Sequence, residues 1–478
     1  MGIHMKKRIS TYIGIILAFV LLTGVFAAAD GGWYVNDALN RLPQFFDGVY
    51  AIGDGGTSLL SGSDIYALSA DGLQLLGAAN STGGGGLRYD DHSIAIRSDR
   101  ISVGLYYYYS ASRDSSLGSV TLQNVVGTGF SFGYEDQNGD YVDLGTTQAR
   151  QITVQAGEND SVLIFDGSAE PVIFLSETGR SKYLQVRPCV EDAEAVTTLA
   201  QRRYYGDFAF AVLGGGKLTV VNQVDLERYV MGVCAIEMSE SWPVEALKAQ
   251  AIAARTYAQK MIQNSVYYYS CGFDLTADTY CQAYLGCENV GNHIETAVRG
   301  TENCYLTYRD TLADALYSAA DGGATESNVN VFGNQDHPYL VGIIDPYEAS
   351  ATANPYRTWT VTMTPAQLGA KMGIGPVREA TPTLSDTGNV IKLVLVADSG
   401  ATATIIRDSC RTVLGLKNIH YTIRRDAAGN FVFTGSGYGH NLGMSQWGAY
   451  SMAKYFEKDF KDILGFYYTG VGLSYGVL

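Results

Sequence analysis

Two adjacent helical patterns near the middle of the chain constrain the fold most, because the residues on either side are typical of strands and turns. In the first pattern, apolar residues recur at helical spacing up to Glu237, at Leu226, Tyr229, Val230 and Val233. The second helix is expected from Pro243, which suits a first helical turn, to about Ile262, and alanines fill it densely. A further helix is expected from Ser445 towards Tyr455.

The rest of the chain predicts short strands. From Ile101 to about Phe165, runs such as ISVGLYYYY and QITVQ alternate with Gly, Asp and Asn turns, and the pattern returns after Asp310. The 55 glycines suit such turns. We therefore predict an α+β fold with a helical core, surrounding mixed β-strands and a β-rich N-terminal region.

A chain of 478 residues is too long for one ordinary hydrophobic core. Its composition divides it into a Gly- and Ser-rich β region at 30–95, a β-rich domain at 96–199 and a third domain at 200–478. The third domain contains the predicted helices.

The N-terminal segment 1–29 shows the order of a secretory signal, with basic residues, an apolar run and then three alanines. An uncleaved membrane anchor is the alternative, because the apolar run with its flanks could nearly cross a bilayer. Residues 1–5 are interpreted as a vector scar. We expect an extracytoplasmic protein, secreted or anchored at the membrane.

The net charge is −15 and the isoelectric point is about 4.8. Such a field repels phosphate backbones, and no basic stripe offsets it, which excludes nucleic acid as a partner. The seven cysteines are an odd number, so at least one stays unpaired within the chain.

Glu237 ends the first apolar stripe. At about 100° per residue it lies close to Leu226 and Val230 on the helix surface. A charged carboxylate is costly there, so desolvation should favour the protonated form, which is a usable general acid for a sugar alkoxide. The alternatives are a side chain that turns outward at a frayed helix end, or one that pairs with a cation.

Several segments resemble one known family. The stretch LERYVMGVCAIEMSESWPVEALKAQAIAARTYA, residues 226–258, is similar to the signature of the stage II sporulation protein D and amidase-enhancer family. Further similar segments follow in the same order, namely DLTADTYCQAYLG, YSAADGGAT, HPYLVGIIDP, RTVLGLKN and GSGYGHNLGMSQWGAYSMA. The match covers about 200–478 in pieces and does not extend clearly into the N-terminal third.

This resemblance implies a peptidoglycan lytic transglycosylase that acts on glycan strands already stripped of stem peptides by an amidase. The family's catalytic glutamate falls at Glu237, which would protonate the oxygen between N-acetylmuramic acid and N-acetylglucosamine. The resulting carboxylate would help the muramyl 6-hydroxyl attack C1, giving a 1,6-anhydro end. No cofactor is required for this chemistry, and one carboxyl suffices. The alternative is a non-catalytic wall-binding protein that enhances an amidase.

Substrate-binding residues are expected from the matched segments. By resemblance His440, Ser445 and Gln446 line a cleft where Glu237 meets the 435–450 loop. The other expected contacts are Lys248, Arg255, Tyr257 and Ser318. The family usually has glycine in place of Asn441, a residue that tolerates the left-handed conformation. For His440, the alternative is fixing the loop by hydrogen bonds.

Lys248 and Arg255 are seven residues apart and so share one helix face. They could pair with Glu237 or hold carboxylate and acetamido groups of a glycan. The alternative is an ordinary solvated face.

Cys281 and Cys287 are candidate zinc ligands, since some family members bind zinc through a cysteine and a histidine six residues later. Here cysteine occupies both positions, with Cys271 and His293 nearby. A disulfide or buried free thiols are the alternatives.

The run Tyr106–Tyr109 has two interpretations. Its rings could stack on sugar rings, or they belong to a strand with one buried face.

Overall fold

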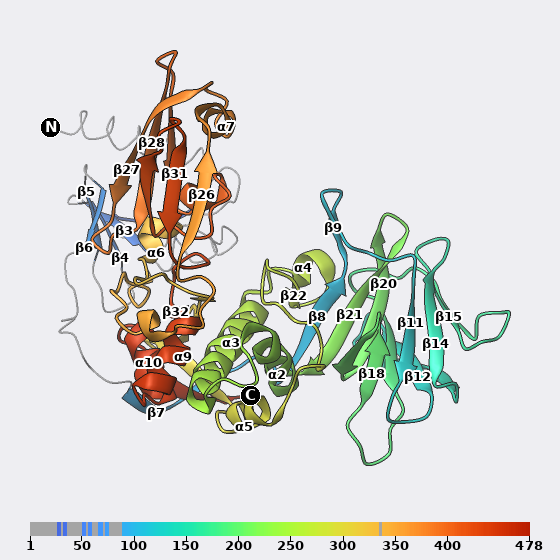
Figure 1. Ribbon diagram of the computed structural model, residues 1–478. Helices are drawn as coiled ribbons and strands as arrows, with labels where there is room; N and C mark the ends of the chain where they lie inside the picture. Colours follow the sequence, from blue (N-terminus) through green and yellow to red (C-terminus); the bar gives the residue numbers. More distant parts are fainter. Residues whose placement is uncertain are drawn as a thin grey trace. The chain divides into compact units, whose positions relative to one another are not determined.

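The computed structural model describes residues 88–333 and 337–478, together with six short strands nearer the N-terminus (Figure 1). The chain forms two compact units, residues 1–85 with 332–336 and residues 86–331 with 337–478. The six strands of the first unit pair in chain order as an antiparallel sheet: β1 (Phe26–Ala29), β2 (Gly32–Val35), β3 (Tyr50–Gly53), β4 (Gly56–Leu59), β5 (Tyr66–Ser69) and β6 (Gly72–Leu75). Apart from β1, the signal-like segment predicted at the N-terminus lies outside the described residues.

The second unit begins with two packed sheets (Figure 1). One has the order β13-β12-β17-β20-β21-β8-β22, and its strands are β8 (Arg100–Tyr106), β12 (Phe130–Glu135), β13 (Tyr141–Thr147), β17 (Leu184–Pro188), β20 (Asp207–Gly214), β21 (Lys217–Asp225) and β22 (Leu275–Thr276). The other has the order β16-β15-β14-β11-β18-β19, and its strands are β11 (Ser119–Asn124), β14 (Gln151–Ala156), β15 (Val162–Phe165), β16 (Ile173–Leu175), β18 (Val196–Leu199) and β19 (Arg202–Tyr205).

Alternation along these strands explains why the sheets pack face to face. In β11, Val120 and Leu122 are buried while their neighbours in the strand are exposed. One apolar cluster contains residues of both sheets, including Leu122, Ile164 and Phe208. The strands predicted between 101 and 165 are confirmed.

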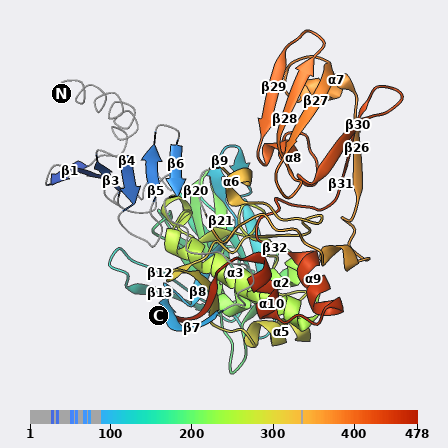
Figure 2. The ribbon, with the colours of Figure 1, turned by 90° about the vertical axis from the view of Figure 1, so that its left-hand side faces the viewer.

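Helix α2 (Leu226–Glu237) follows β21 without a loop, and the Asp225 carboxylate caps it by accepting the backbone N–H groups of Glu227 and Arg228. Helix α3 (Val244–Asn264) buries most of its alanines. It contacts α2 and three further helices, which are α5 (Asn292–Arg299), α9 (Gln446–Tyr455) and α10 (Phe460–Tyr467) (Figure 1 and Figure 2). These bounds confirm the three predicted helices.

The C-terminal part adds strands with an apolar cluster of their own, which includes Leu393, Leu395 and Phe433. Two three-stranded sheets form it, β26-β31-β30 and β27-β28-β29, with β26 (Trp359–Met363), β27 (Val377–Leu384), β28 (Val390–Ala397), β29 (Thr402–Ile406), β30 (Tyr421–Arg425) and β31 (Phe431–Gly435). The short helices are α4 (Tyr268–Cys271), α6 (Asn328–Val331), η2 (Glu348–Ser350), α7 (Pro365–Ala370) and α8 (Ser409–Thr412).

Two small sheets connect distant parts of this unit, and a third is a local hairpin. Strand β7 (Arg88–Ala95) pairs in parallel with β33 (Gly472–Val477), which also pairs with β23 (Cys304–Tyr308) and, through it, β24 (Thr311–Leu312). Strand β25 (Tyr317–Ser318) pairs in parallel with β32 (Met444–Ser445). The hairpin of β9 (Tyr108–Ser110) and β10 (Arg113–Asp114) extends from the seven-stranded sheet.

The domain boundaries predicted at 95 and 199 run through this unit. Strand β7, predicted in the N-terminal region, pairs with the C-terminal β33, and β8 pairs with β21 across the second boundary. Composition misses such boundaries because pairing between distant strands leaves no local signal. The fold is α+β, as predicted, although a helical core describes only the surroundings of α3. Within the described residues, no helix has both the length and the apolar character needed to cross a bilayer.

Candidate functional site

Glu237 is the last residue of α2, and its side chain is half-buried. The Gln446 Nε2 donates a hydrogen bond to Glu237 Oε2 at 2.9 Å, and the backbone of Ala283 also hydrogen-bonds the carboxyl group. Burial raises the pKa of Glu237 above its ordinary value, although these two hydrogen bonds oppose the shift. The carboxyl is therefore biased towards its protonated form, as predicted.

The partner of Glu237 comes from the far end of the sequence. Gln446 is the first residue of α9, is nearly fully buried, and also directs its Nε2 towards Gln250 Oε1 of α3 at 3.4 Å. Helices α2, α3 and α9 thus meet at the carboxyl group. The predicted convergence of Glu237 with the 435–450 loop is present.

Ser445 and Ser318 lie next to the contact between Gln446 and Glu237, since Ser445 directly precedes Gln446 in the chain. The Ser445 hydroxyl caps α9 by accepting the Gly448 N–H at 3.1 Å, and it donates to Glu348 Oε2 at 2.6 Å. Ser318 pairs with Ser445 in the β25–β32 bridge. Both serines are buried, and their expected contact with substrate stays a prediction.

The loop before Ala283 supplies residues that side-chain patterns did not single out. Buried Gln282 accepts a hydrogen bond from Tyr229 at 3.1 Å and donates one to the Tyr317 hydroxyl at 2.9 Å. The loop approaches α2 closely because Gly232 has no side chain, and a Cβ there would meet the Tyr284 ring at 2.5 Å. The segment DLTADTYCQAYLG, matched by resemblance, was the only signal in the sequence for this loop.

His440 is half-buried in the glycine-rich turn. Its Nδ1 accepts the Leu442 backbone N–H at 3.0 Å, and burial lowers the pKa of His440 to about 4, so the ring is neutral. These contacts support the interpretation in which the histidine fixes the loop. Asn441 adopts the expected left-handed conformation, with φ of 64°, and its amide donates to the backbone carbonyls of Asp321 and Ala324.

Lys248 and Arg255 do not pair with Glu237, which corrects one of the expectations for them. Arg255 is fully buried and forms two hydrogen bonds with Glu227, at 2.7 and 2.6 Å. Lys248 Nζ pairs with Glu245 Oε1 at 2.7 Å. The guanidinium of Arg255 has no exposed atom to offer a glycan, because its helix face packs into the core instead of facing solvent.

Tyr257 is half-buried beside Cys281, which interacts with its hydroxyl group. All seven cysteines are free thiols, so the disulfide alternative is absent from the structure. Burial raises the pKa of Cys281 and raises that of Cys287 to about 11, which favours the neutral thiols. The described residues bring no set of three His, Cys, Asp or Glu side chains together around either thiol. The residues present therefore do not fit a tetrahedral zinc site, and zinc binding stays a prediction without structural support.

Three acidic side chains do gather elsewhere. Asp321, Asp345 and Glu348 are all buried and each places a carboxylate oxygen within 4.8 Å of the others. Burial and the negative charges of its two neighbours raise the pKa of Asp321 well above its ordinary value. This acidic cluster reaches the Glu237 site through the Ser445 hydroxyl bound to Glu348.

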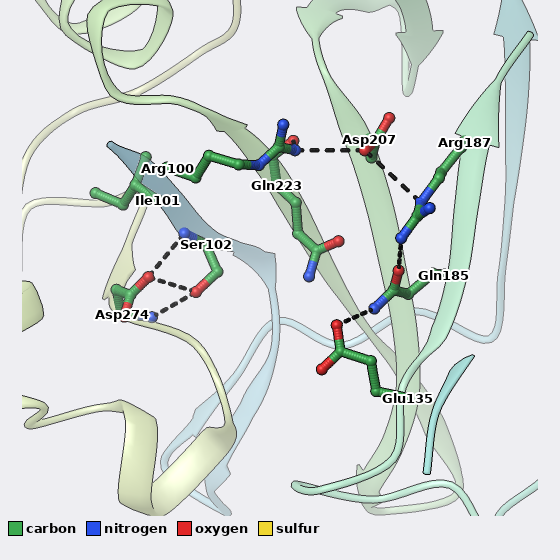
Figure 3. Close-up of a pocket in the computed structure, with 9 residues that line it drawn as sticks. All are labelled: Arg100, Ile101, Ser102, Glu135, Gln185, Arg187, Asp207, Gln223 and Asp274. Carbon is green, nitrogen blue, oxygen red and sulfur yellow. Dashed lines mark hydrogen bonds and ion pairs between the residues drawn. The ribbon is translucent and has the colours of Figure 1, made fainter. Parts of the chain in front are cut away.

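A polar cavity of about 470 Å³ opens on the seven-stranded sheet (Figure 3). Its charged groups bind one another, because Asp207 contacts Arg100 at 3.3 Å and Arg187 at 4.0 Å. No residue predicted for the site lines this cavity. It is therefore not the cleft expected at Glu237.

Comparison with known proteins places this sequence in a family. Residues 214–308 match the family described as Stage II sporulation protein. This range includes Glu237 and the helices α2 and α3. The stage II sporulation protein D of Bacillus amyloliquefaciens is 31% identical over 272 residues, which are 53% of this chain and 75% of that protein. The chain belongs to the stage II sporulation protein D family.

Two further relatives extend the comparison. An uncharacterized protein of Brachyspira hyodysenteriae is 35% identical over 281 residues, 58% of this chain and 73% of that protein. An amidase enhancer of Bacillus subtilis is 27% identical over 299 residues, 51% of this chain but only 40% of its own length. The resemblance to the stage II sporulation protein D and amidase-enhancer family inferred from the sequence motifs is confirmed.

Proposed function

We propose that this protein is a cell-wall lytic transglycosylase that cleaves peptidoglycan glycan strands, with Glu237 as its acid and base. The observation that carries the proposal is a half-buried carboxyl group with a raised pKa, one oxygen of which is held by Gln446. A general acid needs this combination of retained proton and fixed orientation. Membership of the stage II sporulation protein D family supports the assignment.

In the first step, protonated Glu237 gives its proton to the oxygen that bridges N-acetylmuramic acid C1 and N-acetylglucosamine. The C1–O bond breaks, and the N-acetylglucosamine residue leaves with a neutral hydroxyl group. The Gln446 amide N–H and the Ala283 backbone contact stabilise the carboxylate that remains.

In the second step, the muramyl 6-hydroxyl attacks C1 and its proton passes to the Glu237 carboxylate. The product is a 1,6-anhydro end, no water is consumed, and the acid is restored. One carboxyl group serves both steps, so the reaction does not need the pair of carboxyl groups used by hydrolytic glycosidases.

The proposal places the protein outside the cytoplasm at the bacterial wall, acting after an amidase has removed stem peptides. The similarity to an amidase enhancer favours a second candidate, a non-catalytic wall-binding protein that stimulates an amidase. Both candidates share the wall as their place of action. They differ in whether the glycan strand itself is cut.

Digestion of purified peptide-free glycan strands, followed by mass spectrometry, separates the candidates. We expect anhydro-muramyl ends with the parent protein and none with Glu237→Gln. The matched control is Glu295→Gln, which changes an exposed glutamate of α5 in the same way. Ends that carry an added water would show a hydrolase, and uncut strands with folded protein that stimulates an amidase would show the second candidate.

A further inference from the structure

One arginine of the β9–β10 hairpin lies among four tyrosine rings. The Arg113 Cζ lies 5.2 Å from the ring centres of Tyr107 and Tyr109, 5.3 Å from that of Tyr267 and 3.6 Å from that of Tyr280. These residues come from three segments: the hairpin, the residue before α4 and the loop before Cys281. The arginine therefore joins three surface segments through their aromatic rings.

Hydrogen bonds fix this arrangement. Arg113 Nε donates to the Tyr107 hydroxyl at 2.9 Å and Nη1 donates to the Tyr267 hydroxyl at 3.2 Å. The Tyr107 hydroxyl donates to Asp278 Oδ2 at 2.6 Å, and the other oxygen of Asp278 lies 3.6 Å from Arg113 Nη2. The positive charge of Arg113 is thus balanced locally, and hydrogen bonds fix the Tyr107 and Tyr267 rings.

The outer rings of this arrangement are open to solvent. The exposed fractions are 46% for Tyr109, 65% for Tyr280, 50% for Tyr268 and 75% for Tyr269. Tyr109 also contacts Tyr267 edge to face, with ring centres 6.0 Å apart, which connects the hairpin to α4. We call Tyr109, Tyr268, Tyr269 and Tyr280 the tyrosine patch.

One short loop connects the tyrosine patch with the Glu237 site, because it contains both Tyr280 and Ala283. Tyr280 is three residues before Ala283, whose backbone hydrogen-bonds Glu237, and an extended chain spans at most about 10 Å over that separation. Gln282, between them, is held by Tyr229 and Tyr317 near the carboxyl group. The patch and the Glu237 carboxyl group are therefore separated by no more than the length of a few sugar rings.

We propose that the tyrosine patch binds sugar rings of the glycan strand on one side of the cleavage point. This inference rests on the proposed function and adds a subsite to it. Tyrosine rings present apolar faces to the C–H faces of pyranose rings, and their hydroxyl tips can bond sugar hydroxyl groups. Rigid, exposed aromatic side chains that are clustered beside a polar site mark a ligand surface.

The charge of this surface does not favour a polyanionic occupant. Arg113, the cation among the four tyrosine rings, already forms an ion pair with Asp278, and the whole chain has a net charge of −15. Of the two interpretations of the run Tyr106–Tyr109, the exposure of Tyr109 leaves its ring available for stacking, while Tyr107 is buried between β8 and β9.

The test uses binding without chemistry, in a Glu237→Gln background. The dissociation constant for soluble, peptide-free glycan fragments is measured by calorimetry for the parent background and for Tyr109→Ala with Tyr280→Ala. Losing two stacking rings should weaken binding about tenfold. Tyr109→Phe with Tyr280→Phe keeps the rings and should bind within about threefold of the parent background.

Tyr141→Ala is the matched control, because Tyr141 is 40% exposed and lies over Arg187 at 4.3 Å on the sheet, outside the patch. Its affinity should equal that of the parent background. Tyr269→Ala is a second variant for the case in which the double variant does not fold, because Tyr269 is not one of the four rings around Arg113. It should weaken binding about threefold.

The outcomes separate the subsite from the reaction. Normal affinity in the folded alanine variants would overturn the subsite, even if the protein with Glu237 intact produces anhydro ends. A parent background that binds no fragment, together with uncut strands, would overturn the proposed function and the subsite with it. Weaker binding in the alanine variants alone, with the phenylalanine variants and the control unchanged, supports the subsite.

Discussion

Glu237 and the acidic cluster of Asp321, Asp345 and Glu348 are two acidic regions in which burial raises a carboxyl pKa, yet their surroundings differ. Glu237 is half-buried and has one side-chain donor, whereas the cluster is sealed and its carboxylates receive several donors. The comparison teaches that a raised pKa by itself does not mark catalysis. A proton can be transferred to a substrate only where one side of the carboxyl group is open.

Inside the cluster, Glu348 is saturated by protein donors. Its Oε2 accepts the Asp321 N–H at 2.7 Å and the Ser445 hydroxyl at 2.6 Å, while Oε1 accepts the Gly322 N–H at 3.1 Å and the Asn354 amide at 3.2 Å. Asp321 Oδ2 receives no donor from the described residues, so a proton on it can bridge to Glu348. The cluster therefore ties two loops to the start of α9.

The largest expected effect concerns the open carboxyl. Glu237→Gln should lower the rate of anhydro-end formation by about 10²–10⁴-fold, the usual contribution of a general acid. The unfolding midpoint should stay unchanged, because glutamine can still accept the Gln446 hydrogen bond at this half-buried position. Rate assays and thermal melts on the same preparation check both statements. A rate loss that tracks a lower midpoint would contradict the comparison.

Removing the buried charge of Arg255 should lower stability, whereas the Glu237 substitution lowers the rate. Arg255→Ala leaves Glu227 without its buried partner and should lower the free energy of unfolding by about 3–5 kcal/mol. Lys248→Ala, on the same helix but partly exposed, should cost at most about 1 kcal/mol. Urea unfolding measures both. Equal losses in the two variants would show that burial is not what distinguishes them.

Within the cluster, Glu348→Gln should destabilise the fold by about 2–3 kcal/mol, because an amide N–H₂ would face two hydrogen-bond donors. The rate should also fall, since the Ser445 hydroxyl loses its acceptor and Gln446 follows it in the chain. Asp321→Asn should cost less than about 1 kcal/mol, because the amide replaces the proposed O–H donor to Glu348. Urea unfolding of both variants orders them, and a larger loss in Asp321→Asn would refute the protonated Asp321.

The smallest effect is on pH dependence. The folded pKa values of Asp321 and Glu348 lie above their ordinary values of 3.8 and 4.5, so the folded state binds protons more tightly than the unfolded state. Their contribution to stability is complete below those ordinary values and is lost as pH rises through the raised folded values. The melting temperature of the parent protein should therefore fall more steeply above pH 4.5 than that of Asp321→Asn. Parallel plots of melting temperature against pH for the two proteins would contradict a proton held between Asp321 and Glu348.

Local patterns predicted the helices and the pKa shift of Glu237, because both depend on residues close in sequence. They missed the sealing of Arg255, since helical spacing shows which residues share a face but not whether that face meets solvent. The Ala283 contact uses backbone atoms, which leave no trace in side-chain patterns. The meeting of Gln446 with Glu237, 209 residues apart, was reached only through the family resemblance.

The position of Glu237 between two helices has an electrical consequence. It ends α2, where the aligned peptide dipoles give a partial negative charge that disfavours an anion. Its partner Gln446 begins α9, where the partial positive charge favours one. Because these two fields oppose each other, the balance between the charged and neutral forms is left to burial and to the hydrogen bonds from Gln446 and Ala283. A substitution at either helix end would therefore disturb a group that must release a proton and take it back within one turnover.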